Sequence, residues 1–418
     1  MSAREPVGAG DAAAAADAAD AADVVERTRR FVRDVVLPAE PPAGIALDAA
    51  GRRALQQQAR EAGVFAPHAP VRLGGLGLPL GAWSPVFQEA GYSPVGPAAL
   101  NCMAPDEGNM LLLERIATAE QQERFLAPLA AGEVRSCFAM TEPHPGAGSD
   151  PAALATTARR VDGGWVLDGE KRFVSGAEEA GFAIVMARTP DLGDDAATLF
   201  LVRTDAGGFE LGHRVRTLER AITGGHPHVS LSGCFVRDDD VLGTPGDGFR
   251  HAQVRLGPAR LTHCMRWLGL ARRAHDTALD RVRHRELFGA RLSDLGIAQG
   301  MIADSEIDLA SSAALIDRAA AALEGGDVRG GAQASSIAKV HCSEAVGRVV
   351  DRAVQLCGGD GVTLELPLAA FLDEVRPFRV YDGSSETHRW AIARRAVARR
   401  RREVEGGERV LDRAEGRR

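Results

Sequence analysis

The spacing of apolar residues changes twice along this chain of 418 residues, and the change limits the folds that it can adopt. From about Asp23 the apolar residues recur at the 3.6-residue interval of an amphipathic helix. Between about residues 136 and 246 they form short runs bounded by turn residues, and after Gly248 the helical interval returns. The sequence therefore predicts an α+β protein in which one β domain lies between two helical domains.

The first helical domain is predicted over residues 23–135. The apolar residues that carry its spacing are Val24, Val25, Phe31, Val32, Val35, Val36, Leu111, Leu112, Leu113, Ile116, Phe125 and Leu129. A glycine-rich stretch at 72–81 interrupts the pattern and is expected to be a loop. Residues 1–22 are mostly alanine, aspartate and glycine. We expect a disordered leader there, because such residues bury too little apolar surface to offset the entropy of ordering.

The middle domain is predicted over residues 136–246 as an antiparallel β domain. Apolar runs at 182–187 and 199–202 predict strands, and Asp-Gly pairs at 162–163 and 168–169 predict hairpin turns.

The second helical domain is predicted over residues 247–400 as a four-helix bundle. One face of its first helix is formed by Leu261, Met265, Leu268, Ala271, Ala278 and Val282. Further helices are predicted over 293–324 and 332–357, and a last one from about Ser385, where the hydroxyl of Ser384 or Ser385 can cap the first amides. The arginine-rich residues 401–418 are expected to be a charged tail.

Composition argues against several classes of protein. The net charge of −7 disfavours a general nucleic-acid binder. No apolar run reaches the roughly 18 residues of a membrane span, and the N-terminus lacks a secretion signal, so we expect a cytoplasmic protein without membrane contact. The six cysteines form no CxxC pair, which favours reduced thiols over a zinc site, and no metal is expected. A Rossmann site is disfavoured because no glycine fingerprint follows a predicted strand.

Two segments about 240 residues apart contain the residues best suited to chemistry. TEPHPGAGSD at 141–150 combines hydroxyls with glycines, whose backbone amides can approach phosphate oxygens closely. VYDGSSETH at 380–388 places the carboxylate of Asp382 on a tight turn. Neither segment is diagnostic alone, since each also fits an ordinary turn, but together they suggest a site that holds a flavin and abstracts a proton.

The order of these motifs resembles that of the acyl-CoA dehydrogenase family from about residue 24 to 400. FAMTEP, LGPARLTHCMR at 256–266 and YDG in place of YEG are similar to the subgroup of dehydrogenase domains found fused to phosphotransferase-like domains. The resemblance implies FAD as cofactor, with the polar edge of the flavin against Phe138, Met140 and Thr141. It also implies that Gly148 and Ser149 approach the pyrophosphate and the pantetheine of the substrate.

Further cofactor contacts follow from the same resemblance. Phe173 and Ser175 in KRFVSG stand where the family has a tryptophan that covers the flavin and a threonine near its N5 atom. The remaining expected contacts, partly to the cofactor of a neighbouring subunit, are made by Arg285, Phe288, Gln355, Gly358, Gly359, Ser384 and Glu386. The chain departs from the family in two extra residues, most plausibly His144 and Pro145, which leaves the path of their loop open.

The resemblance assigns Asp382 as the base that removes the Cα proton of an acyl thioester, in a dry pocket expected to raise its proton affinity. Arg260, Gly383 and Ser149 are expected to contact the substrate. Family members with the base on the preceding helix have glutamate where this chain has Ala259, so the base must be Asp382. Three histidines are further acid–base or acyl-pocket candidates: His226, His228 and His263.

The resemblance predicts FAD-dependent α,β-dehydrogenation of an acyl thioester, most simply acyl-CoA, within fatty acid metabolism. An electron-transfer flavoprotein is the expected electron acceptor, and the protein is expected to be a homo-oligomer, a tetramer or a dimer. Alternatives on the same fold are an acyl-carrier-protein dehydrogenase, an acyl-CoA oxidase and a flavin monooxygenase. A non-catalytic oligomeric paralogue is a further alternative, disfavoured by the retained Thr141, Ser149, Arg285 and Asp382.

Overall fold

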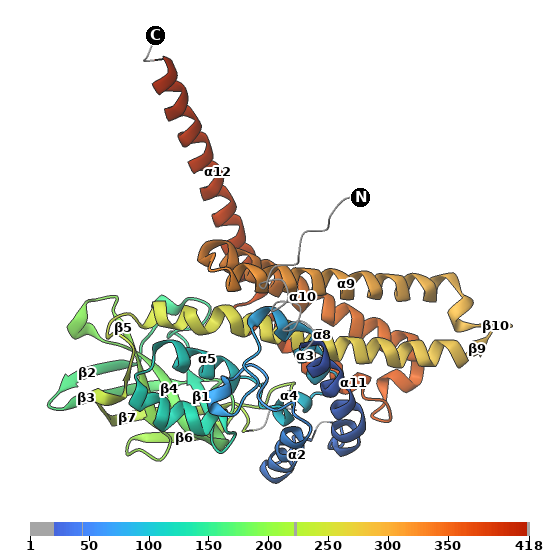
Figure 1. Ribbon diagram of the computed structural model, residues 1–418, viewed down its shortest axis with the longest axis horizontal. Helices are drawn as coiled ribbons and strands as arrows, with labels where there is room; N and C mark the ends of the chain where they lie inside the picture. Colours follow the sequence, from blue (N-terminus) through green and yellow to red (C-terminus); the bar gives the residue numbers. More distant parts are fainter. Residues whose placement is uncertain (1–20, 44, 221–223, 416–418) are drawn as a thin grey trace, which may run out of the picture.

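The computed structural model describes residues 21–43, 45–220 and 224–415 and has the three predicted parts in chain order (Figure 1). The first part is helical, beginning with a helical segment over 21–31. Its further helices are α2 (Ala49–Glu61), α3 (Leu80–Gly91), α4 (Gly96–Ala99), α5 (Asp106–Ile116), α6 (Ala119–Gln121) and α7 (Ala127–Ala130). The predicted leader lies outside the described residues except for its last two, which already belong to the first helical segment.

The middle part is an eight-stranded sheet. Its strands are β1 (Arg135–Ala139), β2 (Thr157–Val161), β3 (Gly164–Lys171), β4 (Ala180–Arg188), β5 (Ala197–Arg203), β6 (Phe209–Arg214), β7 (Pro227–Arg237) and β8 (Val241–Leu242). They follow the order β6-β7-β3-β2-β4-β5-β8, with β1 beside β4. The hairpins are antiparallel as predicted, whereas β1 pairs with β4 in parallel.

One predicted turn is wrong. Asp162-Gly163 forms the β2–β3 turn, but Asp168-Gly169 lies inside β3 at a register shift. Gly169 has φ 148°, and an added Cβ would lie 2.6 Å from Thr156 Oγ1. Gly169 therefore allows a register shift in β3 and lets Thr156 pack closely against the strand.

The third part is a bundle of long helices. Its elements are α8 (Gly248–His284), β9 (Glu286–Leu287), β10 (Ala290–Arg291), α9 (Gly296–Glu324), α10 (Val328–Cys357), α11 (Leu368–Val375) and α12 (Ser385–Glu415). In Figure 1, α8 runs from the side of the sheet to the β9–β10 hairpin, and α12 projects away from the body. Because α12 continues to Glu415, the stretch predicted as a tail from residue 401 is helical over most of its length.

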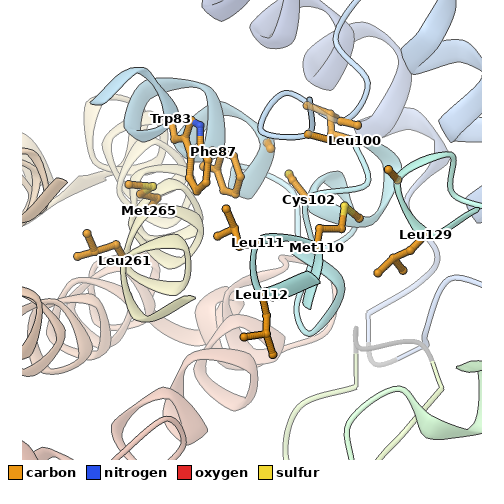
Figure 2. Packing of buried hydrophobic residues seen from close by; sticks show 14 of the residues in the cluster. Trp83, Phe87, Leu100, Cys102, Met110, Leu111, Leu112, Leu129, Leu261 and Met265 are labelled. Atoms are coloured by element: carbon orange, nitrogen blue, oxygen red, sulfur yellow. The ribbon is translucent and has the colours of Figure 1, made fainter. Parts of the chain in front are cut away.

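Apolar packing joins the first and third parts. Trp83 and Phe87 of α3 are stacked, with ring centroids 5.6 Å apart, and Figure 2 shows them beside Leu111 of α5 and Met265 of α8. This buried cluster holds α8 against the N-terminal helices and so fixes the position of the polar face of α8. Among the described residues, no helix is both long enough and apolar enough to cross a membrane.

Candidate active site

Asp382 lies on the turn that precedes α12, and groups from three helices hold this turn. Arg260 Nε of α8 donates to Asp382 O at 3.0 Å, and His388 Nε2 of α12 lies 3.1 Å from the same oxygen. Lys339 Nζ of α10 donates to Gly383 O at 2.8 Å. Burial lowers the pKa of His388 to about 4 and that of Lys339 to about 8. At neutral pH the histidine is therefore uncharged and the lysine remains a charged donor.

The backbone of this turn is unusual. Asp382 has φ 52°, a left-handed conformation that costs a residue with a Cβ atom about 1 kcal/mol or more. Gly383 follows with φ 92°, and an added Cβ would lie 2.7 Å from His388 Nε2. The three donors that hold the turn therefore maintain a strained geometry, which is a recurring property of functional sites.

Ser384 ends the turn and caps α12. Its Oγ accepts from Thr387 N at 3.2 Å, which confirms the predicted cap at Ser384 rather than Ser385. Glu386, in the first turn of α12, is exposed. Both residues stay predictions as cofactor contacts.

The carboxylate of Asp382 faces the cationic side of α8. Its side chain is 20% exposed, and Oδ2 lies 3.2 Å from His263 Nε2. Burial raises the pKa of Asp382, but His263 and the guanidinium groups of Arg255 and Arg260 lower it more, so the net pKa is well below the usual value. The expectation of a raised proton affinity is therefore wrong for this structure. The sequence predicted that the acid is buried, but it did not predict the cationic side chains that surround it and lower its pKa.

The end of β1 and the start of the segment after β3 lie side by side. Thr141 O accepts from Arg172 N at 2.8 Å, which brings the predicted flavin contacts Met140 and Thr141 next to Phe173. Phe173 has φ 57° and is 47% exposed, so its ring is available to a ligand. Arg255 links this edge to the base, because its guanidinium lies 4.4 Å from the Phe138 ring centroid and its charge acts on Asp382.

Glu142 determines the path of the loop that carries the two extra residues. Its carboxylate accepts from Ala147 N at 3.0 Å, Ala155 N at 2.6 Å and Thr156 N at 2.9 Å. Lys171 Nζ donates to the same carboxylate at 2.8 Å. The extra residues therefore lie in a turn closed around a buried acid, while Gly148 and Ser149 remain exposed at its rim.

The three candidate histidines have different surroundings. His263 adjoins Asp382, as described above. His226 Nδ1 lies 2.9 Å from Ser175 Oγ, and its Nε2 lies 2.9 Å from Glu219 Oε1. His228 stacks on the ring of His213 at 4.7 Å. Only His263 therefore adjoins the predicted base.

A second group of predicted cofactor residues gathers at the far end of α8. Arg285 and Phe288 belong to the β9–β10 hairpin, and Arg281 pairs with Asp360 at 2.6 Å, which brings the end of α10 with Gln355, Gly358 and Gly359 alongside. Arg260 lies on α8 and Arg285 directly follows its last residue, so the two are 25 positions apart, about 37 Å along the helix axis. The structure thus places these residues in two clusters rather than one.

Two glycines and one exposed aromatic ring are suited to contact a dinucleotide ligand with an aromatic ring system. An added Cβ at Gly148 or Gly359 would meet no protein atom within 4 Å, and neither residue has a positive φ. The chain itself therefore gives no reason for glycine at these positions, whereas close approach of a ligand does. Phe288 is 94% exposed, which is unusual for a large apolar ring unless something else covers it.

Sequence reasoning did not select Arg255, Lys339 or His388 for the site. One signal was available for the lysine: the chain has lysine only at Lys171 and Lys339, and both side chains are fully buried. In a chain whose other cations are arginines, two retained lysines indicate positions where a compact ammonium group is needed.

Comparisons with known proteins agree over most of the chain. Residues 18–133, 137–225 and 246–397 match the N-terminal, middle and C-terminal domain models of acyl-CoA dehydrogenase. The chain is 35% identical over 322 residues to FadE2 of Mycobacterium tuberculosis, assigned as an acyl-CoA dehydrogenase, with 76% of this chain and 79% of that protein covered. It is 34% identical over 319 residues, 74% of this chain, to acyl-CoA dehydrogenase family member 11 of Gallus gallus, of which it spans 40%.

A solved structure agrees as well. The fold matches that of a Mycobacterium abscessus protein assigned to the acyl-CoA dehydrogenases with a TM-score of 0.84 and 32% identity, over 91% of this chain and 98% of that one.

Proposed function

We infer that this chain, which belongs to the acyl-CoA dehydrogenase family, oxidises an acyl thioester across its Cα–Cβ bond. Members of the family are FAD-dependent oxidoreductases. The observation that carries the proposal is the carboxylate of Asp382, held on a strained turn by Arg260 and Lys339 and placed 3.2 Å from His263. The lowered pKa keeps the carboxylate ionised at neutral pH, the form that a base requires, while it weakens the carboxylate as a proton acceptor.

In the proposed reaction the Cα proton passes to a carboxylate oxygen of Asp382. FAD, when bound, would supply the acceptor for the hydrogen that leaves Cβ with two electrons. The thioester carbonyl gains negative charge as the Cα proton leaves, and the backbone amide of Asp382 is the proposed donor to that oxygen. Arg260 acts through the backbone, because its bond to Asp382 O fixes the turn rather than the carboxylate.

FAD is proposed to lie against Phe138, Thr141, Phe173 and Ser175, where an aromatic edge meets two hydroxyls. The distant cluster around Arg285 is proposed to clamp the cofactor of a neighbouring subunit, since one chain keeps it about 37 Å along α8 from Arg260. This arrangement requires a homo-oligomer, a dimer or a tetramer. An electron-transfer flavoprotein is the proposed electron acceptor, fatty acid metabolism the proposed role, and the cytoplasm the proposed compartment.

Anaerobic flavin bleaching tests the proposal. Purified holoprotein is mixed without oxygen with straight, branched, hydroxylated and carrier-bound acyl thioesters, and the flavin absorbance is followed. At least one thioester should bleach the wild type, while Asp382→Asn should retain FAD and lose bleaching. Undiminished bleaching by Asp382→Asn would exclude Asp382 as the base.

A further inference from the structure

His263 connects the predicted base to a buried arginine. His263 lies one turn beyond Arg260 on α8, and its Nε2 is 3.2 Å from Asp382 Oδ2. Its other ring nitrogen, Nδ1, is 2.8 Å from Arg266 Nη2. The imidazole therefore lies directly between a carboxylate and a guanidinium.

This order of groups fixes which nitrogen carries the proton. A guanidinium can only donate hydrogen bonds, so Nδ1 of His263 must accept the bond from Arg266. The ring proton is then on Nε2, the nitrogen that faces Asp382. This N–H faces Asp382 Oδ2 across 3.2 Å, and Oδ2 is a buried oxygen that makes no other hydrogen bond among the described residues.

Arg266 is held in place by further contacts to Cys102 and Glu107. Its Nη1 donates to Cys102 O at 3.2 Å, and its Nη2 lies 3.5 Å from Glu107 Oε1. Thr262 Oγ1 donates to the same carboxylate oxygen at 2.8 Å. Glu107 and Arg266 are buried, so the inner end of this chain of groups is screened from solvent and has little freedom to rearrange, whereas Asp382 at its outer end is 20% exposed.

Charged and titratable groups reach this chain from every helix packed around it. They are Glu107 of α5, Arg255, Arg260 and Arg266 of α8, Lys339 of α10, Tyr381 and His388. The arginines carry a fixed positive charge near neutral pH, and Lys339, with a pKa of about 8, is mostly charged there. Of the cationic side chains that the structure describes, His263 makes the ion-pair contact with the Asp382 carboxylate, at 3.2 Å.

We propose that His263 is a positioning residue for Asp382, held by Arg266 in the tautomer that donates from Nε2 and keeps the carboxylate oriented toward Cα. The proposal rests on the proposed function of Asp382 as the base. It differs from a role for His263 as a wall of the acyl pocket, because a wall would change how tightly a thioester binds rather than the rate at which the bound thioester loses its Cα proton.

The test compares three variants by the maximal rate of anaerobic bleaching at saturating thioester and by the half-saturating thioester concentration. In His263→Leu the maximal rate should fall at least about tenfold while the half-saturating concentration stays unchanged, because the carboxylate is no longer held toward Cα. His263→Gln, whose amide can donate from a similar position, should restore most of the wild-type rate. His275→Gln is the matched control: His275 is also buried on α8 but lies 3.0 Å from Glu306, and its maximal rate should be unchanged.

An unchanged maximal rate in His263→Leu, or an effect confined to the half-saturating thioester concentration, would overturn the proposal. FAD content and circular dichroism establish that each variant is folded. If no thioester bleaches even the wild type, the proposed function fails instead. The tautomer is then still testable in histidine-labelled protein by nitrogen NMR, where His263 Nδ1 should be unprotonated; a protonated Nδ1 would overturn the inference independently of any activity.

Discussion

Replacing Lys171 with methionine should destabilise the protein strongly. Lys171 Nζ lies 2.8 Å from Glu142 Oε1, with the two side chains 0% and 2% exposed, and it also donates to Met140 O at 3.3 Å. The variant keeps most of the side-chain volume but leaves the Glu142 carboxylate without its cation. Because Glu142 closes the loop from Pro143 to Thr156, the loss acts on the turn that bears Gly148 and Ser149.

The pKa values of the two partners bear on the magnitude. Burial raises the pKa of Glu142, but Lys171 and the Thr156 and Ala147 donors lower it further, to about 2 from 4.5, which corresponds to about 3 kcal/mol. The pKa of Lys171 instead falls to about 8, because burial outweighs the attraction of Glu142. The lowered pKa of Glu142 indicates that the fold favours its charged form, whereas the lowered pKa of Lys171 indicates that the fold disfavours the charged form of the lysine. The Glu142 shift also includes the Thr156 and Ala147 donors, which the variant keeps. We therefore take the magnitude from the usual cost of leaving one partner of a buried ion pair without its counter-charge, about 3 kcal/mol.

Unfolding in urea should therefore show a loss of about 3 kcal/mol for Lys171→Met. Arg159→Met is the matched control on the neighbouring hairpin strand, because its pair with Asp168 is exposed at 3.4 Å and should be worth less than about 0.5 kcal/mol. A loss below about 1 kcal/mol for Lys171→Met, with the cooperativity of the transition unchanged, would refute the reasoning.

Two other predictions concern the cofactor clamp and acid stability. Arg285→Ala should weaken FAD retention at least about tenfold, the cost of one charge-assisted contact, while Arg283→Ala, which pairs with Asp280, should not; equal affinities in a fluorescence titration would exclude the contact. Because the folded-state pKa of Glu142 lies below its unfolded value, its contribution is complete above about pH 4.5 and is lost as pH falls toward 2. Acid titration of Glu142→Gln should therefore show a stability deficit that shrinks over this range, and a constant deficit would contradict the assignment.

The sequence predicted the order of the three parts because the apolar period reports the type of element directly. The prediction failed where a residue pair typical of turns lies inside a strand. Asp168-Gly169 has the composition of a hairpin turn, yet its glycine serves a close approach inside β3. The parallel pairing of β1 with β4 joins segments about 45 residues apart, and no local pattern encodes such a pairing.

At the candidate site, too, the local structure was predictable from the sequence and the tertiary contacts were not. The turn at Asp382 was predictable from its own residues, and the resemblance placed Arg260 beside it. The surroundings of the carboxylate were not predictable, because His263 and Lys339 reach the turn from positions 119 and 43 residues earlier in the chain. Burial is visible in an apolar sequence context, whereas the convergence of cations from separate helices is a property of tertiary packing.

Exchange of the Cα hydrogen tests the central claim most directly, because it isolates proton abstraction from hydride transfer. In deuterated buffer, holoprotein is incubated with a thioester that lacks a Cβ hydrogen, such as 3,3-dimethylbutyryl-CoA, and deuterium at Cα is followed by mass spectrometry. If Asp382 is the base, the wild type and Asp382→Glu should exchange the Cα hydrogen. In Asp382→Asn the exchange should fall to the level measured without protein. Exchange by Asp382→Asn at the wild-type rate would contradict it.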